Sequence, residues 1–89
     1  MSDGDAWAEY QRQALGLSAR QRVFLQLLAQ GYTARGVAIE TRYSWAYVYA
    51  QMRVIRDVLG AQTNTAAVVA GLRAGIIVMP SPDEMVVSG

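Results

Sequence analysis

The sequence predicts an all-α protein, because the chain divides into segments that each carry a helix start signal, an apolar stripe and a glycine stop. The clearest segment runs from Ser44, which can cap the amides of a first turn, to Gly60, which can adopt the left-handed turn that ends a helix. Its apolar residues recur at i, i+4, i+7 and i+11, which places them on one face: Val48, Met52, Ile55 and Leu59. This helix carries more apolar and aromatic surface than a core needs, which suggests that its other faces contact a partner.

Shorter helices are expected around it. In chain order they cover about 3–15, 18–30, 33–40 and 65–74. Ser18 and Gln21 form a Ser-x-x-Gln capping box, and Thr33 caps the next helix. The sequence therefore predicts a four-helix domain with an extra short N-terminal helix. Its organisation is an N-terminal helical extension over 1–16, a globular domain over 17–77 and a C-terminal tail over 78–89, which its prolines keep loosely attached.

Composition excludes several kinds of chemistry. At 89 residues the chain is one small domain, and it contains neither Cys nor His. Disulfides, thiol chemistry, the usual zinc sites and histidine acid–base catalysis are therefore excluded. Glu40 and Asp57 are too isolated to form a carboxylate pair, so no catalytic residue, metal or cofactor is expected. The acidic N-terminus is unlike a secretory signal, and the longest apolar run is too short to span a bilayer, which predicts a cytoplasmic protein that does not bind membranes.

Charge is unevenly distributed along the chain. Residues 12–77 carry eight Arg and two acidic residues, a net charge of +6, whereas the whole chain has a net charge of +1. A basic middle between acidic ends is typical of a small DNA-binding domain. The alternative interpretation of this charge is a solvated arginine-rich surface.

Several segments resemble LuxR/GerE-type helix-turn-helix domains. They include Leu17-Ser18-Ala19-Arg20-Gln21-Arg22, Leu27-Leu28-Ala29-Gln30-Gly31 and Gly75-Ile76-Ile77, and the similarity runs without a gap over residues 17–77. Region four of sigma factors is similar over the first three helices only. The resemblance is to the stand-alone members of the family, since no sensor or receiver domain precedes this one.

The resemblance implies a four-helix domain whose third helix enters the DNA major groove and whose fourth helix pairs two copies. Such domains bind short inverted repeats in promoters and recruit or block RNA polymerase. Two features depart from the family pattern. Arg42 stands where the turn glycine is usual, so a non-glycine residue must hold a conformation that glycine favours. Tyr47 and Tyr49 replace the Thr and Lys that commonly touch DNA.

Two functions follow as hypotheses. The first is a sequence-specific regulator that binds double-stranded DNA, in which arginines contact phosphates or guanine and Tyr47, Tyr49 and Gln51 lie near base edges. Arg53 is the preferred base reader. The predicted DNA-binding residues are Arg35, Arg42, Trp45, Tyr47, Tyr49, Gln51, Arg53 and Arg56.

The second hypothesis is a protein-interaction module. Trp45, Tyr47 and Tyr49 would bind another transcription factor or RNA polymerase, because aromatic residues and arginine are enriched at interface hot spots. A homodimer is expected through the smooth side of the last helix, and the alternative is an exposed alanine-rich helix without a partner. The predicted dimer residues are Ala66, Val69, Ala70 and Arg73.

Overall fold

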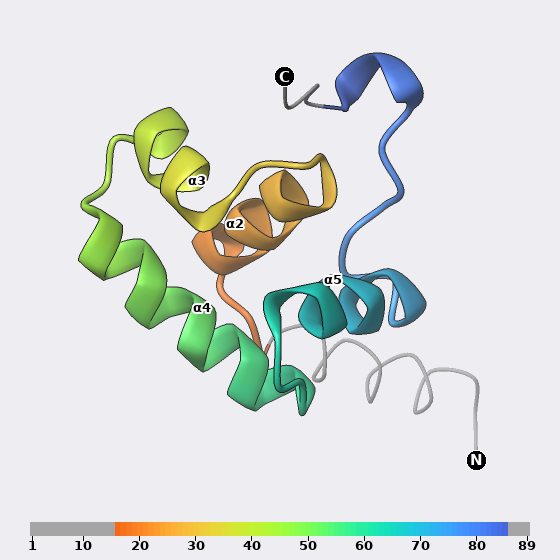
Figure 1. Ribbon diagram of the computed structural model, residues 1–89. Coiled ribbons are helices and arrows are strands. Elements are labelled where there is room, and N and C mark those ends of the chain that lie inside the picture. The colour runs from red at the N-terminus through yellow and green to blue at the C-terminus, as the bar shows by residue number, and fades with distance from the viewer. Residues whose placement is uncertain (1–15, 86–89) are drawn as a thin grey trace.

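The computed structural model describes residues 16–85, which fold into helices with no strand in that range. The helices are α2 (Ala19–Ala29), α3 (Ala34–Thr41), α4 (Trp45–Leu59) and α5 (Asn64–Arg73), followed by the short 3₁₀ helix η1 (Pro82–Glu84) (Figure 1). The prediction of an all-α protein is confirmed. The N-terminal helix expected over about 3–15 lies outside the described residues.

The helix starts are set by side-chain caps, as the sequence indicates. The Ser18 hydroxyl accepts a hydrogen bond from the Gln21 amide at 3.1 Å, and the Gln21 side chain accepts one from the Ser18 amide at 2.9 Å. This confirms the capping box. Thr33 and Ser44 cap α3 and α4 with their side-chain oxygens, which accept from backbone amides of the first turn. Helix α5 is capped by Thr63 and begins one residue earlier than expected.

Helices α2 and α4 form the centre of the fold. Each packs against the other three helices, whereas α3 and α5 pack against this central pair rather than directly against each other. Figure 1 shows α4 along one edge of the molecule, with the other helices on the same side of it. That arrangement leaves one long side of α4 uncovered within residues 16–85.

The buried core confirms most of the predicted α4 stripe. Val48, Met52 and Ile55 are fully buried, and Leu59 is half-buried at its edge. The buried apolar residues come from every helix and from both flanking segments: Leu17, Phe24, Leu25, Val37, Ala38, Val48, Met52, Ile55, Ala67 and Ile77.

The inner face of α5 is formed by small residues. Ala67 and Gly71 are buried, and Val68 and Leu72 are half-buried against the core. A Cβ added at Gly71 would lie 2.8 Å from Leu25 Cδ2. Small residues are therefore needed here because α5 lies close against α2.

The connection between α3 and α4 is three residues long and contains the strained position expected from the sequence. Arg42 has φ 63° and ψ 25°, the left-handed conformation. No other non-glycine residue among 16–85 has a positive φ. This conformation reverses the chain between Thr41 and Ser44 and so determines how α4 leaves α3.

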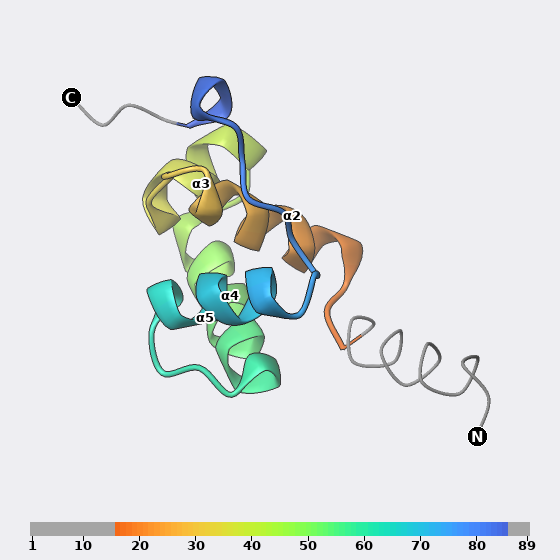
Figure 2. The same ribbon diagram turned by 90° about the vertical axis from the view of Figure 1, so that its right-hand side faces the viewer.

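The segment after α5 is attached to α2 where the predicted tail begins. The Gln26 side chain donates to the Val78 carbonyl at 2.8 Å and accepts from the Val78 amide at 3.0 Å. Pro80 is buried, and the chain then passes α2 towards η1 (Figure 2). Among the described helices, none combines the length and apolar character that crossing a membrane would require.

Candidate functional site

The uncovered side of α4 carries several of the sequence-predicted site residues, and the fold keeps them exposed. Trp45 is 52% exposed and Tyr49 is 56% exposed. Ala46, Ala50 and Arg53 are exposed as well, and their positions fall within about 60° of one another around a helix. We call Ala46, Ala50 and Arg53 the outward strip.

One flank of this strip faces α2, and it contains two of the predicted DNA-binding residues. Tyr47 is half-buried, with its ring edge-on to Phe24 at 6.3 Å between centroids and 4.9 Å from the ring of Tyr43. Gln51 is also half-buried, and its side-chain oxygen accepts a hydrogen bond from Gln21 at 2.9 Å. The sequence placed both side chains near base edges, but the Tyr47 hydroxyl and the Gln51 side-chain oxygen each accept a hydrogen bond from α2.

Arg20 is a candidate functional residue that the sequence analysis missed. Its Nη1 donates to the Tyr47 hydroxyl at 2.8 Å, and its guanidinium lies 5.0 Å from the centre of the Tyr43 ring. The hydrogen bond to Tyr47, together with the nearby Tyr43 and Tyr47 oxygens, raises the pKa of Arg20 above its ordinary value. No local signal could have found this arrangement, because 27 residues separate Arg20 from Tyr47.

Arg20 is charged at every ordinary pH, as any arginine is, and its raised pKa acts in the same direction. A pKa that is higher in the folded state adds stability at every pH below the unfolded value, and that stability is lost only as the pH rises through the folded value. For Arg20 both values lie in strongly alkaline solution. The guanidinium is therefore a permanent, exposed positive charge beside α4.

The other flank of the strip faces α3 and is aromatic. The rings of Trp45 and Tyr49 lie 5.4 Å apart, one turn from each other on α4. Arg35 of α3 places its guanidinium 5.9 Å from the centre of the Trp45 ring. Ile39, one turn further along α3, is 74% exposed. On this flank, the positive charge of Arg35, which lies near the Trp45 ring, is therefore next to apolar surface.

The remaining predicted arginines divide into two kinds. Arg42 and Arg53 are exposed. Arg56 is half-buried and donates to the Asn64 side chain at 2.6 Å, which ties the end of α4 to the start of α5. Arg56 thus has a partner within the fold, whereas Arg42 and Arg53 extend from its surface.

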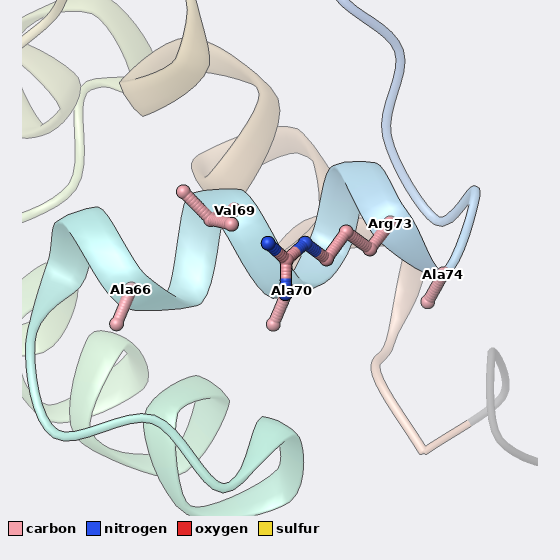
Figure 3. Close-up of a pocket in the computed structure, with 5 residues that line it drawn as sticks. All are labelled: Ala66, Val69, Ala70, Arg73 and Ala74. Carbon is pink, nitrogen blue, oxygen red and sulfur yellow. The ribbon is translucent and has the colours of Figure 1, made fainter.

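The predicted dimer residues share one face of α5. Ala66, Val69, Ala70 and Arg73, which we call the α5 face, line a shallow depression together with Ala74 (Figure 3). Within this lining, the Val69 side chain is 42% exposed. The lining is mainly apolar, with the Arg73 guanidinium lying across it.

These surfaces are exposed, and the depression on α5 is shallow. Within residues 16–85, no group of three acidic, His or Cys side chains could hold a metal ion.

Searches against protein-family models, curated proteins and solved structures find no match to this chain. What the fold defines is a small all-α domain whose longest helix is exposed along one side.

Proposed function

We propose that this protein is a sequence-specific transcriptional regulator that binds double-stranded DNA with α4 in the major groove. One observation carries the proposal: the exposed strip of α4 lies between two arginines, each held against an aromatic ring by a neighbouring helix. The B-DNA major groove admits an α-helix and is bordered on both sides by phosphates. A helix flanked by fixed positive charges is complementary to that groove.

The two arginines approach different sides of α4. Trp45 and Tyr47 are two residues apart, so their side chains leave the helix about 160° apart. Arg35 lies over Trp45, and Arg20 bonds to Tyr47. On this proposal, each guanidinium contacts phosphates of one DNA strand on its own side of the inserted helix.

Aromatic contacts favour this use of the arginines. An arginine side chain loses rotamer entropy when it is immobilised on a phosphate, and that loss weakens binding. Stacking on Tyr43 or Trp45 holds the guanidinium in place before DNA arrives, while leaving its remaining N–H groups free to donate. Arg42, exposed at the turn before α4, adds a third positive charge nearby.

The α5 face supports a homodimer. Two copies related by a two-fold axis would each present an α4, and such pairs bind inverted half-sites about one helical turn apart. This organisation agrees with the resemblance to LuxR/GerE-type domains over residues 17–77. On that basis we propose that the protein acts at promoters, where it recruits or blocks RNA polymerase.

The test is salt-dependent binding to random-sequence duplex DNA. Each phosphate contact that is removed lowers the slope of log affinity against log salt by about one. Arg20→Ala and Arg35→Ala should each produce that change. Arg22→Ala is the matched control, because Arg22 lies on the same helix as Arg20 but lines a depression with Val23 and Ile76 on another face. A wild-type slope near zero would overturn the proposal.

A second function is favoured by the apolar part of the same surface. Trp45 and Tyr49 are exposed as a pair of adjacent, tilted rings, with exposed Ile39 on the neighbouring helix. Such a patch suits a protein partner, either RNA polymerase or another regulator. Purified RNA polymerase that binds the wild type without DNA, but not Trp45→Ala, would support this alternative.

A further inference from the structure

The chemistry of the outward strip indicates which bases α4 would read. Tyr47 and Gln51, the polar residues expected at base edges, each accept a hydrogen bond from α2 and are half-buried. Between the two flanks, Ala46, Ala50 and Arg53 are exposed, and Asp57 is exposed on the same side one turn beyond Arg53. The three residues of the outward strip therefore carry two methyl groups and one strong hydrogen-bond donor.

Each of these side chains has a preferred partner in the major groove. Alanine makes apolar contact with the C5-methyl group of thymine, and arginine donates two hydrogen bonds to O6 and N7 of guanine. Small side chains also let the helix backbone approach the base edges closely. The strip is thus complementary to T·A pairs at Ala46 and Ala50 and to a G·C pair at Arg53.

The helical rise relates the spacing of these contacts to the spacing of base pairs. At about 1.5 Å per residue, Ala46 and Ala50 are separated by about 6 Å along α4. Since base pairs stack about 3.4 Å apart, that distance corresponds to about two base pairs. Ala50 and Arg53 are about 4.5 Å apart along the axis, which corresponds to one or two base pairs.

From this geometry, and resting on the proposed function, we infer the content of the half-site. It contains two T·A pairs about two base pairs apart, whose thymine methyl groups contact Ala46 and Ala50. A G·C pair follows one or two base pairs further on, and its guanine accepts two hydrogen bonds from Arg53. Two thymine methyls and one guanine, rather than a row of polar contacts, determine the sequence preference.

The experiment begins with selection of bound duplexes from a random library by the full-length protein. In the selected sequence, each thymine is then replaced singly by deoxyuridine, which removes only the methyl group. Loss of one buried methyl contact should weaken binding about fourfold at each of the two positions. The same replacement at thymines outside the half-site is the control and should leave the affinity unchanged.

The guanine contact is tested on the protein side. Arg53→Lys keeps the positive charge but loses the planar fork that donates two bonds to one guanine. It should reduce discrimination between G·C and A·T at that position at least fivefold. Arg22→Lys, the same exchange away from the strip, should preserve the discrimination.

The outcomes separate this inference from the function on which it rests. Deoxyuridine sensitivity at two positions near a guanine supports the inference. A selected site that tolerates deoxyuridine throughout, or that lacks the guanine, overturns it while leaving DNA binding intact. Failure to retain any duplex, together with a salt slope near zero, overturns the proposed function itself.

Discussion

The outward strip of α4 and the α5 face contain the same three residues at the same spacing. Ala46, Ala50 and Arg53 are matched by Ala66, Ala70 and Arg73, each set at i, i+4 and i+7. Both sets lie on sides of their helices that the described fold leaves open. Any difference in their roles must therefore come from the surroundings rather than from the pattern.

Those surroundings differ in charge and shape. The α4 strip lies between Arg20 and Arg35, each held near an aromatic ring. The α5 set lines a shallow, mainly apolar depression together with exposed Val69. Neighbouring helices therefore make the α4 strip suitable for a polyanion, and the α5 face suitable for an apolar partner such as another copy of the chain.

The largest effect is expected from a negative charge on the α4 strip. Ala50→Glu would place a carboxylate against phosphates and base edges, and like-charge contact at an interface costs several kcal/mol. We expect loss of DNA affinity by roughly 4 kcal/mol in a fluorescence anisotropy titration. Ala70→Glu, the same change at the matching α5 position, should leave the affinity of one protomer for a half-site unchanged. Equal effects of the two variants would contradict the division of roles.

A negative charge on the α5 face should weaken the dimer rather than DNA binding. Val69→Glu would bury a carboxylate twice in a two-fold contact, which should weaken a dimer by about 3 kcal/mol. Analytical ultracentrifugation should then give the monomer mass at concentrations where the wild type is dimeric. A wild type that is already monomeric at high concentration would remove the dimer from the proposal.

The inner side of α5 should respond to added volume more strongly than its outer side. Gly71→Val would force atoms to within 2.8 Å of Leu25, a fully buried residue, and overpacking of this kind costs about 2 kcal/mol. Ala70→Val, one position away on the open side, should change the free energy of unfolding much less. Urea denaturation of both variants measures the difference. Similar midpoints for the two would show that the contact between α5 and α2 is loose.

The smallest effect is expected at the turn before α4, where stability and binding should change in opposite directions. Arg42 holds φ at 63°, and a non-glycine residue in the left-handed region costs roughly 1 kcal/mol. Arg42→Gly should therefore raise the free energy of unfolding by up to about 1 kcal/mol. It should also lower the salt slope of DNA binding by about one, because a phosphate contact is lost. A destabilised variant would mean that contacts of the Arg42 side chain outweigh the strain.

Local features of the fold could be predicted because their causes are local. Ser18 and Ser44 cap helices through hydrogen bonds to amides three residues away, and Gly60 ends α4 in the left-handed conformation. The strain at Arg42 also follows from the chain itself, because a left-handed residue is needed to leave α3. Each depends on residues within one helical turn, which a sequence displays directly.

The candidate site could be predicted only in part. The exposure of Trp45, Tyr49 and Arg53 follows from their offset from the apolar stripe. The engagement of Tyr47 with Arg20 does not, and neither does that of Gln51 with Gln21 or Arg56 with Asn64. Periodicity says that a side chain lies beside the core, but not which neighbouring helix reaches it.

The helical class, most helix ends and the apolar stripe of α4 can be derived from the sequence alone, as can the concentration of arginine in the middle of the chain. The packing of the helices is needed to know which flank of α4 contacts α2 and which arginines lie against aromatic rings. It also distinguishes the two identical Ala–Ala–Arg sets, because only one of them lies among positive charges. These two groups of features differ because they depend on interactions of different range along the chain. Caps and periodicity act within about one turn of helix, whereas the electrostatic character of a surface is the sum of groups brought together from distant parts of the chain.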